Sequence, residues 1–298
     1  MNGQRRKQSH HKPPWLKIKP RFGPVYIEMK TLLKQLELHT VCQEAGCPNI
    51  GECFSAHTAT FMILGDKCTR NCRFCGVKSN HPLPPDLDEP SRVAQAVKKL
   101  NLRFAVITSV TRDDLADGGA TIFAETVNQI RKENPDCKIE LLIPDFAGNS
   151  KALDIVLNVK PNVLAHNIET VPDLYNKVRP LADYGRSLDV LKHISEKTED
   201  IITKSGMMVG LGETFQQIEE TLNDVARINC QIFTVGQYLA PSKNHLPVKK
   251  YYAPEEFDLI KKIGENSGIK HIESGPLVRS SYMAHKQTEQ FLRKIKAT

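Results

Sequence analysis

The 298-residue sequence has no long hydrophobic run, since its apolar stretches extend over only a handful of residues. A membrane-spanning helix needs ~20 consecutive apolar residues, so we expect no membrane span and no membrane partner. Aromatic residues are also scarce, at 6% with a single tryptophan. Charged residues make up 25%, which is typical of a soluble globular protein. A chain of this length can bury the core of one large α/β domain.

Residues 1–21 contain no acidic side chain but seven lysines and arginines, which accounts for the whole net charge of +7. We expect this segment to be a flexible, solvated arm. Alternatively, it docks an acidic partner protein or nucleic acid, or it is a transit peptide. No signal-peptide core precedes the Pro-Pro-Trp-Leu-Lys run at 13–17, which looks like the start of a mature domain.

The rest of the chain is electrically neutral, because it holds as many acidic as basic residues. This neutrality and the few aromatic residues disfavour a second hypothesis, a nucleic-acid-binding module held together by zinc. Such a module needs a positive surface distributed over the domain. We therefore expect no nucleic-acid partner.

Eight cysteines are present, and six of them fall between residues 42 and 75 in two sets of three. In a chain without a signal peptide, clustered cysteines indicate metal binding in a reducing compartment rather than disulfides. We therefore expect a cytoplasmic protein. The two isolated cysteines, Cys137 and Cys230, lie beside strand-like runs and are expected to be small core residues.

The second set, Cys68, Cys72 and Cys75, lies on one short loop after the apolar run 60–65. Three thiolates on such a loop can hold three irons of a cubane cluster and leave the fourth open, whereas iron–sulfur clusters normally have four cysteine ligands. A structural zinc site is the alternative, but this spacing is uncommon for zinc, and zinc has no redox chemistry. The C-x3-C-x2-C spacing, with Phe74 before the last cysteine, resembles the cluster loop of radical S-adenosylmethionine enzymes.

The first set, Cys42, Cys47 and Cys53, has the spacing C-x4-C-x5-C and is interrupted by glycine, proline and asparagine. We expect an irregular wrap whose thiols converge on one metal centre. A structural metal clip is the alternative. Three cysteines again leave a ligand missing, and the Arg-Ser-Ser-Tyr run at 279–282 is a candidate source. A serine oxygen is a harder ligand than a thiolate and should bind iron less tightly.

From residue 60 the sequence alternates strand-like and helix-like patterns, which predicts βαβ units and a parallel sheet. Six strands fit a partial barrel or an open sheet. The expected strands are 60–64, 103–110, 138–143, 162–167, 201–209 and 232–239. Polar residues follow several of them, including Glu169, and ligands gather at the carboxyl ends of parallel strands. Glu169 is a candidate for binding ribose hydroxyls and Arg186 for binding a methionine carboxylate, although for both a surface ion pair or a helix charge is equally plausible.

Together, the two cysteine sets and the C-terminal Arg-Ser-Ser-Tyr resemble the lipoyl synthase family of the radical S-adenosylmethionine superfamily. The resemblance extends from about residue 14 over nearly the whole chain. Further matching stretches are 112–115, 117–119, 166–170 and 236–239.

The resemblance implies a partial (β/α)6 TIM-type barrel with N-terminal and C-terminal extensions that carry an auxiliary iron–sulfur cluster. Accordingly, we expect the basic arm at 1–21, an N-terminal extension at 22–58, the barrel at 59–269 and a C-terminal extension at 270–298.

The resemblance also implies an enzyme with two [4Fe-4S] clusters and S-adenosylmethionine. One cluster would be held by the cysteines at 68, 72 and 75. The auxiliary cluster would be held by those at 42, 47 and 53 with Ser281, which the family pattern favours over Ser280. Deoxyadenosyl radicals would abstract hydrogen at C6 and C8 of an octanoyl group on a carrier lysine, and sulfur from the auxiliary cluster would be inserted at each carbon.

The partners implied are octanoylated lipoyl carrier domains, of the 2-oxoacid dehydrogenase E2 or glycine cleavage H protein type, together with an electron donor and cluster-assembly proteins.

Overall fold

The structure, a computed structural model, describes residues 12–18, 23–55 and 58–296. Most of the predicted basic arm therefore lies outside the described residues. The part of the arm that is described, 12–18, contains a short 3-10 helix, η1 (Pro14–Leu16).

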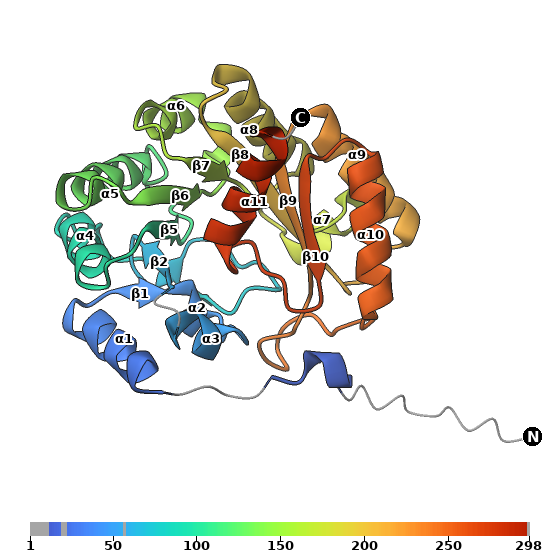
Figure 1. The fold of residues 1–298 in the computed structure, drawn as a ribbon, viewed down its shortest axis with the longest axis horizontal. Coiled ribbons are helices and arrows are strands. Elements are labelled where there is room, and N and C mark those ends of the chain that lie inside the picture. Colours follow the sequence, from blue (N-terminus) through green and yellow to red (C-terminus); the bar gives the residue numbers. More distant parts are fainter. Residues whose placement is uncertain (1–11, 19–22, 56–57, 297–298) are drawn as a thin grey trace, which may run out of the picture.

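An eight-stranded sheet forms the centre of the fold, and its strands follow one another in the order β1-β2-β5-β6-β7-β8-β9-β10 (Figure 1). All neighbours are parallel except β1 and β2, which pair antiparallel. The strands are β1 (His39–Thr40), β2 (Thr60–Ile63), β5 (Phe104–Ser109), β6 (Lys138–Leu142), β7 (Val163–Ala165), β8 (Ile202–Val209), β9 (Ile232–Gln237) and β10 (His271–Gly275). A sheet that adds each new parallel strand on the same side winds in one direction, as in a TIM-type barrel.

Helices connect the strands and cover the outside of this sheet (Figure 1). They are α4 (Glu89–Lys99), α5 (Ala120–Glu133), α6 (Ser150–Asn158), α7 (Tyr175–Val178), α8 (Tyr184–Lys197), α9 (Phe215–Arg227) and α10 (Pro254–Asn266). Capping residues in the local sequence determine where several of these helices begin. Thr214, for example, begins α9 with a capping box in which its side chain accepts from the Gln217 amide and the Gln217 side chain accepts in return.

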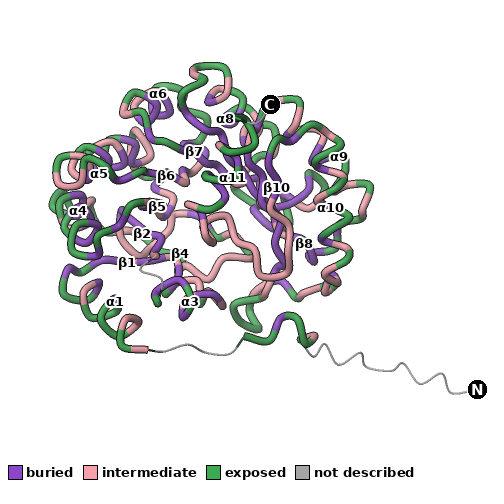
Figure 2. The backbone as a smooth tube through the Cα atoms, in the orientation of Figure 1, coloured by how far each residue is buried: buried purple, intermediate pink, exposed green. Residues whose placement is uncertain are grey.

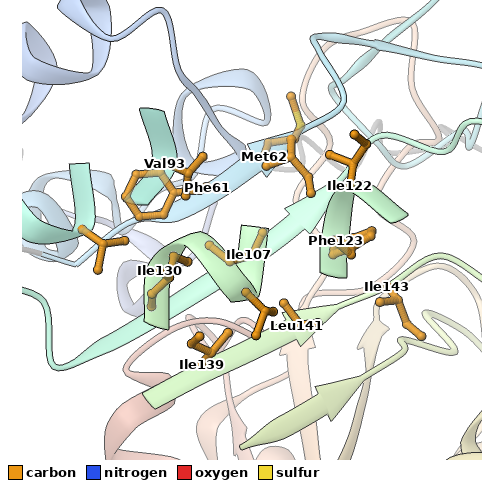
Figure 3. Packing of buried hydrophobic residues seen from close by; sticks show 14 of the residues in the cluster. Phe61, Met62, Val93, Ile107, Ile122, Phe123, Ile130, Ile139, Leu141 and Ile143 are labelled. Carbon is orange, nitrogen blue, oxygen red and sulfur yellow. The ribbon is translucent and has the colours of Figure 1, made fainter. Parts of the chain in front are cut away.

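The main core lies between the sheet and these helices, as the buried strands and more exposed outer helices of Figure 2 show. In Figure 3, Phe123 and Ile130 of α5 pack against Ile107 of β5 and Ile139 of β6. At the amino-terminal ends of the strands, Phe291 packs with residues that begin β7, β8 and β9. Phe291 belongs to the last helix, α11 (Ala284–Lys296), which therefore closes the amino-terminal end of the sheet.

The remaining elements surround the cysteines. They are α1 (Pro24–Gln35), α2 (Val41–Glu44), α3 (Ile50–Ser55), β3 (Lys67–Cys68), β4 (Lys78–Ser79), η2 (Phe146–Gly148) and η3 (Pro172–Leu174). Among the described residues, none of the helices has the length and apolar content needed to cross a membrane.

The six predicted parallel strands and the partial-barrel fold class are confirmed. The sheet also contains two strands that the sequence did not predict. β10 has the sequence His-Ile-Glu-Ser-Gly, too polar and short to stand out, and is a strand because it pairs with β9 from His271 to Gly275. β1 has only two residues and exists through its pairing with β2.

Candidate active site

The loop with Cys68, Cys72 and Cys75 begins at the end of β3 and lies over the carboxyl ends of the parallel strands. The backbone amides of Arg70 and Thr111 donate to Cys68 Sγ at 3.4 and 3.3 Å, and the Cys75 amide donates to the Cys72 carbonyl at 3.0 Å. Thr111 follows β5, so one amide of the sheet's upper edge already points at a sulfur of the loop. Amide donors of this kind stabilise thiolate ligands.

The thiols of this loop are largely withdrawn from solvent. Burial, together with the nearby Cys72, Cys68 and Glu169, raises the pKa of Cys75 to about 12. Burial also raises the pKa of Cys72, but the charge of Arg179 and a hydrogen bond from it oppose that rise. Metal binding to such thiols must displace their protons.

Arg70 anchors this loop to the ends of β5 and β6. Its guanidinium donates to both carboxylate oxygens of Asp113, at 2.7 and 2.8 Å, and to both of Asp145, at 2.9 and 2.7 Å. Asp145 is fully buried. Burial alone would raise its pKa, but the hydrogen bonds and charge of Arg70 hold that pKa well below its usual range. The sequence analysis did not identify Arg70, although a charged residue between two cluster cysteines was a signal.

Glu169 and Arg186, the two cofactor-binding candidates from the sequence, lie in different surroundings. Glu169 lies just beyond β7 with a φ of 65°, a strained value for a side chain of this kind. Its carboxylate accepts from Asn167 Nδ2 at 3.1 Å and is near Cys72 and Cys75. Arg186, three residues after the N-cap Asp183 of α8, instead donates from Nε to Asp145 at 2.8 Å.

The first cysteine set surrounds a second site. Cys42, Cys47, Cys53 and Ser281 line one cavity of about 20 Å³ together with Arg279 and Tyr282. The cysteines come from α2, α3 and the turn between them, whereas the serine comes from the far end of the chain. Ser280 points elsewhere, since its Oγ accepts from Asn167 Nδ2 at 3.4 Å. The cavity therefore has three soft sulfur atoms and one hydroxyl.

Burial dominates the electrostatics of this cavity. Burial, together with the neighbouring thiols, raises the pKa of Cys42 to about 11 and that of Cys53 to about 12. The pKa of Cys47 is also raised by burial, although the charge of Arg279 opposes the rise. These three thiols are therefore protonated when no metal is bound, and a cationic centre is needed to hold them as thiolates.

A close backbone approach brings Ser281 to this cavity. A Cβ added at Gly236 in β9 would lie 2.1 Å from the Val278 carbonyl oxygen and 3.1 Å from Arg279 Nη1. Only glycine at this position lets the C-terminal segment cross the sheet so closely. The Tyr282 hydroxyl then donates to Glu52 at 3.2 Å and joins this segment to α3.

In the described part of the chain, no three His, Cys, Asp or Glu side chains converge closely enough to hold a single metal ion. A structural zinc site needs four ligands around one ion. In a cubane cluster each cysteine binds a different iron, so its ligands need not meet at one point. Both sets supply three free thiols, the type of ligand that holds iron–sulfur clusters.

Comparisons with known proteins agree with this geometry. The model of the radical SAM superfamily matches residues 62–225, and the model of the N-terminal domain of lipoyl synthase matches residues 2–47. A lipoyl synthase from Rubrobacter xylanophilus is 55% identical over 280 residues, which cover 94% of this chain and 87% of the relative. One from Caldicellulosiruptor saccharolyticus is 53% identical over 278 residues, covering 93% and 98%.

Solved structures with much lower sequence identity share the fold. The [FeFe]-hydrogenase maturase HydG superposes with a TM-score of 0.55 at 14% identity, covering 76% of this chain and 58% of that one. Methylornithine synthase superposes with a TM-score of 0.52 at 13% identity, covering 93% of both chains. At these low identities the likenesses show the fold alone.

Proposed function

The chain belongs to the lipoyl synthase family of radical S-adenosylmethionine enzymes, and from this we propose that it inserts sulfur at C6 and C8 of an octanoyl group. The octanoyl group would be amide-linked to a lysine of a lipoyl carrier domain, and the product would be the lipoyl cofactor. Membership of the family implies an enzyme that uses a [4Fe-4S] cluster and S-adenosylmethionine. Such a cluster supplies the electron that generates a radical able to attack an unactivated carbon.

In this proposal, Cys68, Cys72 and Cys75 hold the cluster that binds S-adenosylmethionine. Three ligands on one loop leave one iron of a cubane open, and the loop lies at the end of the sheet where barrel enzymes bind ligands. Glu169 is our candidate for the ribose hydroxyls because its carboxylate lies beside these thiols. Arg186 is our candidate for the methionine carboxylate, since a guanidinium bound to Asp145 through Nε retains other N–H donors.

The observation that carries the proposal is the second cavity, where Ser281 joins Cys42, Cys47 and Cys53. We propose that these four side chains hold an auxiliary [4Fe-4S] cluster, from which the inserted sulfur is taken. An oxygen ligand binds iron less tightly than a thiolate, so Ser281 is the point at which this centre opens. Correspondingly, we assign 22–58 and 270–298 as the extensions that carry the auxiliary site, 59–269 as the barrel and 1–21 as a separate arm.

The proposed partners follow from this chemistry. Octanoylated carrier domains of the E2 or H protein type would supply the substrate, an external donor the electrons, and cluster-assembly proteins the iron and sulfide. Free thiols at both sites require reducing conditions, and we propose the cytoplasm as the compartment.

An anaerobic assay tests the proposal directly. The reconstituted protein, which should contain about eight irons and eight sulfides per chain, is given an octanoyl-lysine carrier peptide, S-adenosylmethionine and a reductant. We expect a peptide with two added sulfur atoms, detected by mass spectrometry. Cleavage of S-adenosylmethionine without any sulfur-containing peptide would refute the assignment.

Two alanine variants separate the clusters in the same assay. Cys53→Ala should abolish sulfur insertion but leave cleavage of S-adenosylmethionine measurable, whereas Cys72→Ala should abolish both. Loss of cleavage in Cys53→Ala, with Cys72 and its loop intact, would show that the division of labour between the two sites is wrong.

A further inference from the structure

Arg179 is a buried cation whose charge no carboxylate balances by direct contact. It follows α7 and is only 8% exposed. Two other buried arginines of the site are neutralised: Arg70 pairs with Asp113 and Asp145, and Arg112 with Asp114. No ion pair within 4.0 Å joins Arg179 to an acidic side chain of residues 12–18, 23–55 or 58–296. A charge buried in this way is costly unless something nearby carries negative charge.

A network of neutral groups fixes the guanidinium in place. Arg179 Nη1 donates to the Asn167 carbonyl and to the Tyr175 hydroxyl, both at 3.0 Å. The Tyr175 hydroxyl donates to Ser187 Oγ at 3.0 Å, and Ser187 is in turn hydrogen-bonded to His166 at 3.1 Å. All of these side chains are buried. The position of Arg179 is therefore determined by β7, α7 and α8 together.

One donor of Arg179 remains without a partner. Its Nε is buried and makes no hydrogen bond to any described residue. A buried donor of this kind usually indicates a group that binds there.

The missing negative charge lies on the cluster loop. The Arg73 amide, between Cys72 and Cys75, donates to the Val178 carbonyl at 2.9 Å, so the backbone directly before Arg179 is bonded to that loop. Phe74, also between Cys72 and Cys75, packs against the hydrophobic cluster that contains Val178. Arg179 thus lies beside the loop whose thiols become thiolate ligands in the proposed function.

We propose that Arg179 raises the reduction potential of the cluster held by Cys68, Cys72 and Cys75, acting through Cys72. This inference rests on the proposed function. Net charge and hydrogen bonds to the sulfurs set the potentials of iron–sulfur clusters. Reduction adds one negative charge, and a fixed positive charge in a region of low dielectric constant stabilises the more negative state.

The step that Arg179 favours is the entry of one electron from an external low-potential donor. The donor loses one electron, no covalent bond forms or breaks, and Arg179 keeps its proton. An arginine guanidinium is not deprotonated in proteins. The guanidinium therefore remains a constant positive charge across the working pH range.

A redox titration of the reconstituted full-length protein tests this inference. Wild type, Arg179→Gln, Arg179→Lys and the double variant Arg112→Gln/Asp114→Asn are titrated anaerobically with dithionite and viologen mediators. The paramagnetic signal of the reduced protein is recorded before and after S-adenosylmethionine is added. The part of the signal that changes belongs to the cluster held by Cys68, Cys72 and Cys75, because that cluster binds S-adenosylmethionine in the proposed function. Its potential without S-adenosylmethionine is then compared among proteins with equal iron content.

For Arg179→Gln we expect the ratio of reduced to oxidised cluster at a fixed applied potential to fall about tenfold. A tenfold change corresponds to about 59 mV for a one-electron couple. Arg179→Lys should lie near wild type because the charge is kept. The double variant Arg112→Gln/Asp114→Asn is the matched control and should leave the potential unchanged, since it removes a neutral ion pair without changing the net charge. If Arg179→Gln does not take up iron, Arg179→Met replaces it.

An unchanged potential in a neutral Arg179 variant with full iron content would overturn the inference. If such a variant also bound S-adenosylmethionine more weakly, Arg179 would serve to bind that cofactor and not to set the potential. Either result leaves the proposed function intact if the wild type still forms the dithiolated peptide. Failure of the wild type to form that peptide would instead count against the proposed function.

Discussion

The side-chain amide of Asn49 donates a hydrogen bond to the carbonyl oxygen of Leu277, at 2.8 Å across 228 residues of sequence. Asn49 is buried and lies between Cys47 and Cys53, whereas Leu277 lies four residues before Ser281. This bond therefore joins the N-terminal cysteine segment to the C-terminal segment that carries Ser281, and both segments line the same cavity. Neither segment forms the cavity alone, so its integrity depends on such contacts.

We expect Asn49→Ala to loosen the second site without disturbing the first. The substitution leaves the half-buried Leu277 carbonyl without its donor, which costs about 0.5–1.5 kcal/mol. Urea unfolding of the metal-free protein should show a loss of that size. In the reconstituted protein, a chelator should remove about half of the iron faster than from wild type. Faster loss of all the iron would contradict the assignment of Asn49 to the second site alone.

Ser280 and Ser281 should respond differently to removal of their hydroxyls. Ser281 lines the cavity, whereas Ser280 accepts a hydrogen bond from Asn167. Ser281→Ala should abolish the second sulfur insertion, and Ser281→Cys should hold iron more tightly because a thiolate is the softer ligand. Ser280→Ala loses one long hydrogen bond, so its rate of product formation should fall by at most about tenfold. Equal losses in the two alanine variants would remove the distinction.

The sequence predicted much of this site because its chemistry depends on spacing along the chain. Cys68, Cys72 and Cys75 lie on one loop, so a sequence pattern alone places them together. Ser281 was found only through a family pattern, since nothing local connects it to cysteines more than 220 residues earlier. In the fold, six parallel strands were predicted from the alternation of strand-like and helix-like patterns, whereas β10 depends on its pairing with β9.

Arg179 was missed for a related physical reason. A single arginine before a proline has no local signature, and its importance comes from burial and from partners on three elements. Arg186 shows the converse. It was selected as a charged residue near a predicted strand end, but its Nε donates to Asp145. Asp145 also accepts hydrogen bonds from both terminal nitrogens of Arg70. Ion-pair networks of this kind are set by tertiary structure and cannot be derived from one sequence.

The Arg70–Asp145 pair should contribute strongly to the stability of the cluster loop. Arg70→Lys keeps the charge but cannot reproduce four hydrogen bonds to two carboxylates, and it leaves Arg186 as the remaining guanidinium partner of the fully buried Asp145. Loss of hydrogen bonds to a charged group costs about 1.5–3 kcal/mol, which urea unfolding would detect. Arg112→Lys is the control, because its partner Asp114 is 38% exposed and can be hydrated. A smaller loss for Arg70→Lys than for Arg112→Lys would contradict the expectation.

The stability of the protein should depend on pH through His166. Burial, reinforced by the charge of Arg179, lowers the pKa of His166 to about 4 in the folded state, against about 6.5 in the unfolded chain. Because the folded pKa is the lower one, the unfolded state takes up the proton first. Stability is therefore fully present above pH 6.5 and is lost as the pH falls toward 4, by about 2 kcal/mol at pH 5.

His166→Asn should remove this pH dependence while keeping a donor for the Ile143 carbonyl, which His166 contacts at 2.9 Å. At pH 7.5 the variant should be less stable than wild type, since the contact with Ser187 is lost. Between pH 7.5 and 5, however, it should lose about 2 kcal/mol less stability than wild type, because no buried imidazole opposes protonation. Urea unfolding of the metal-free proteins at both pH values measures the difference, with the exposed His81→Asn as the control. Identical pH profiles for wild type and His166→Asn would show that His166 is not held neutral by its burial.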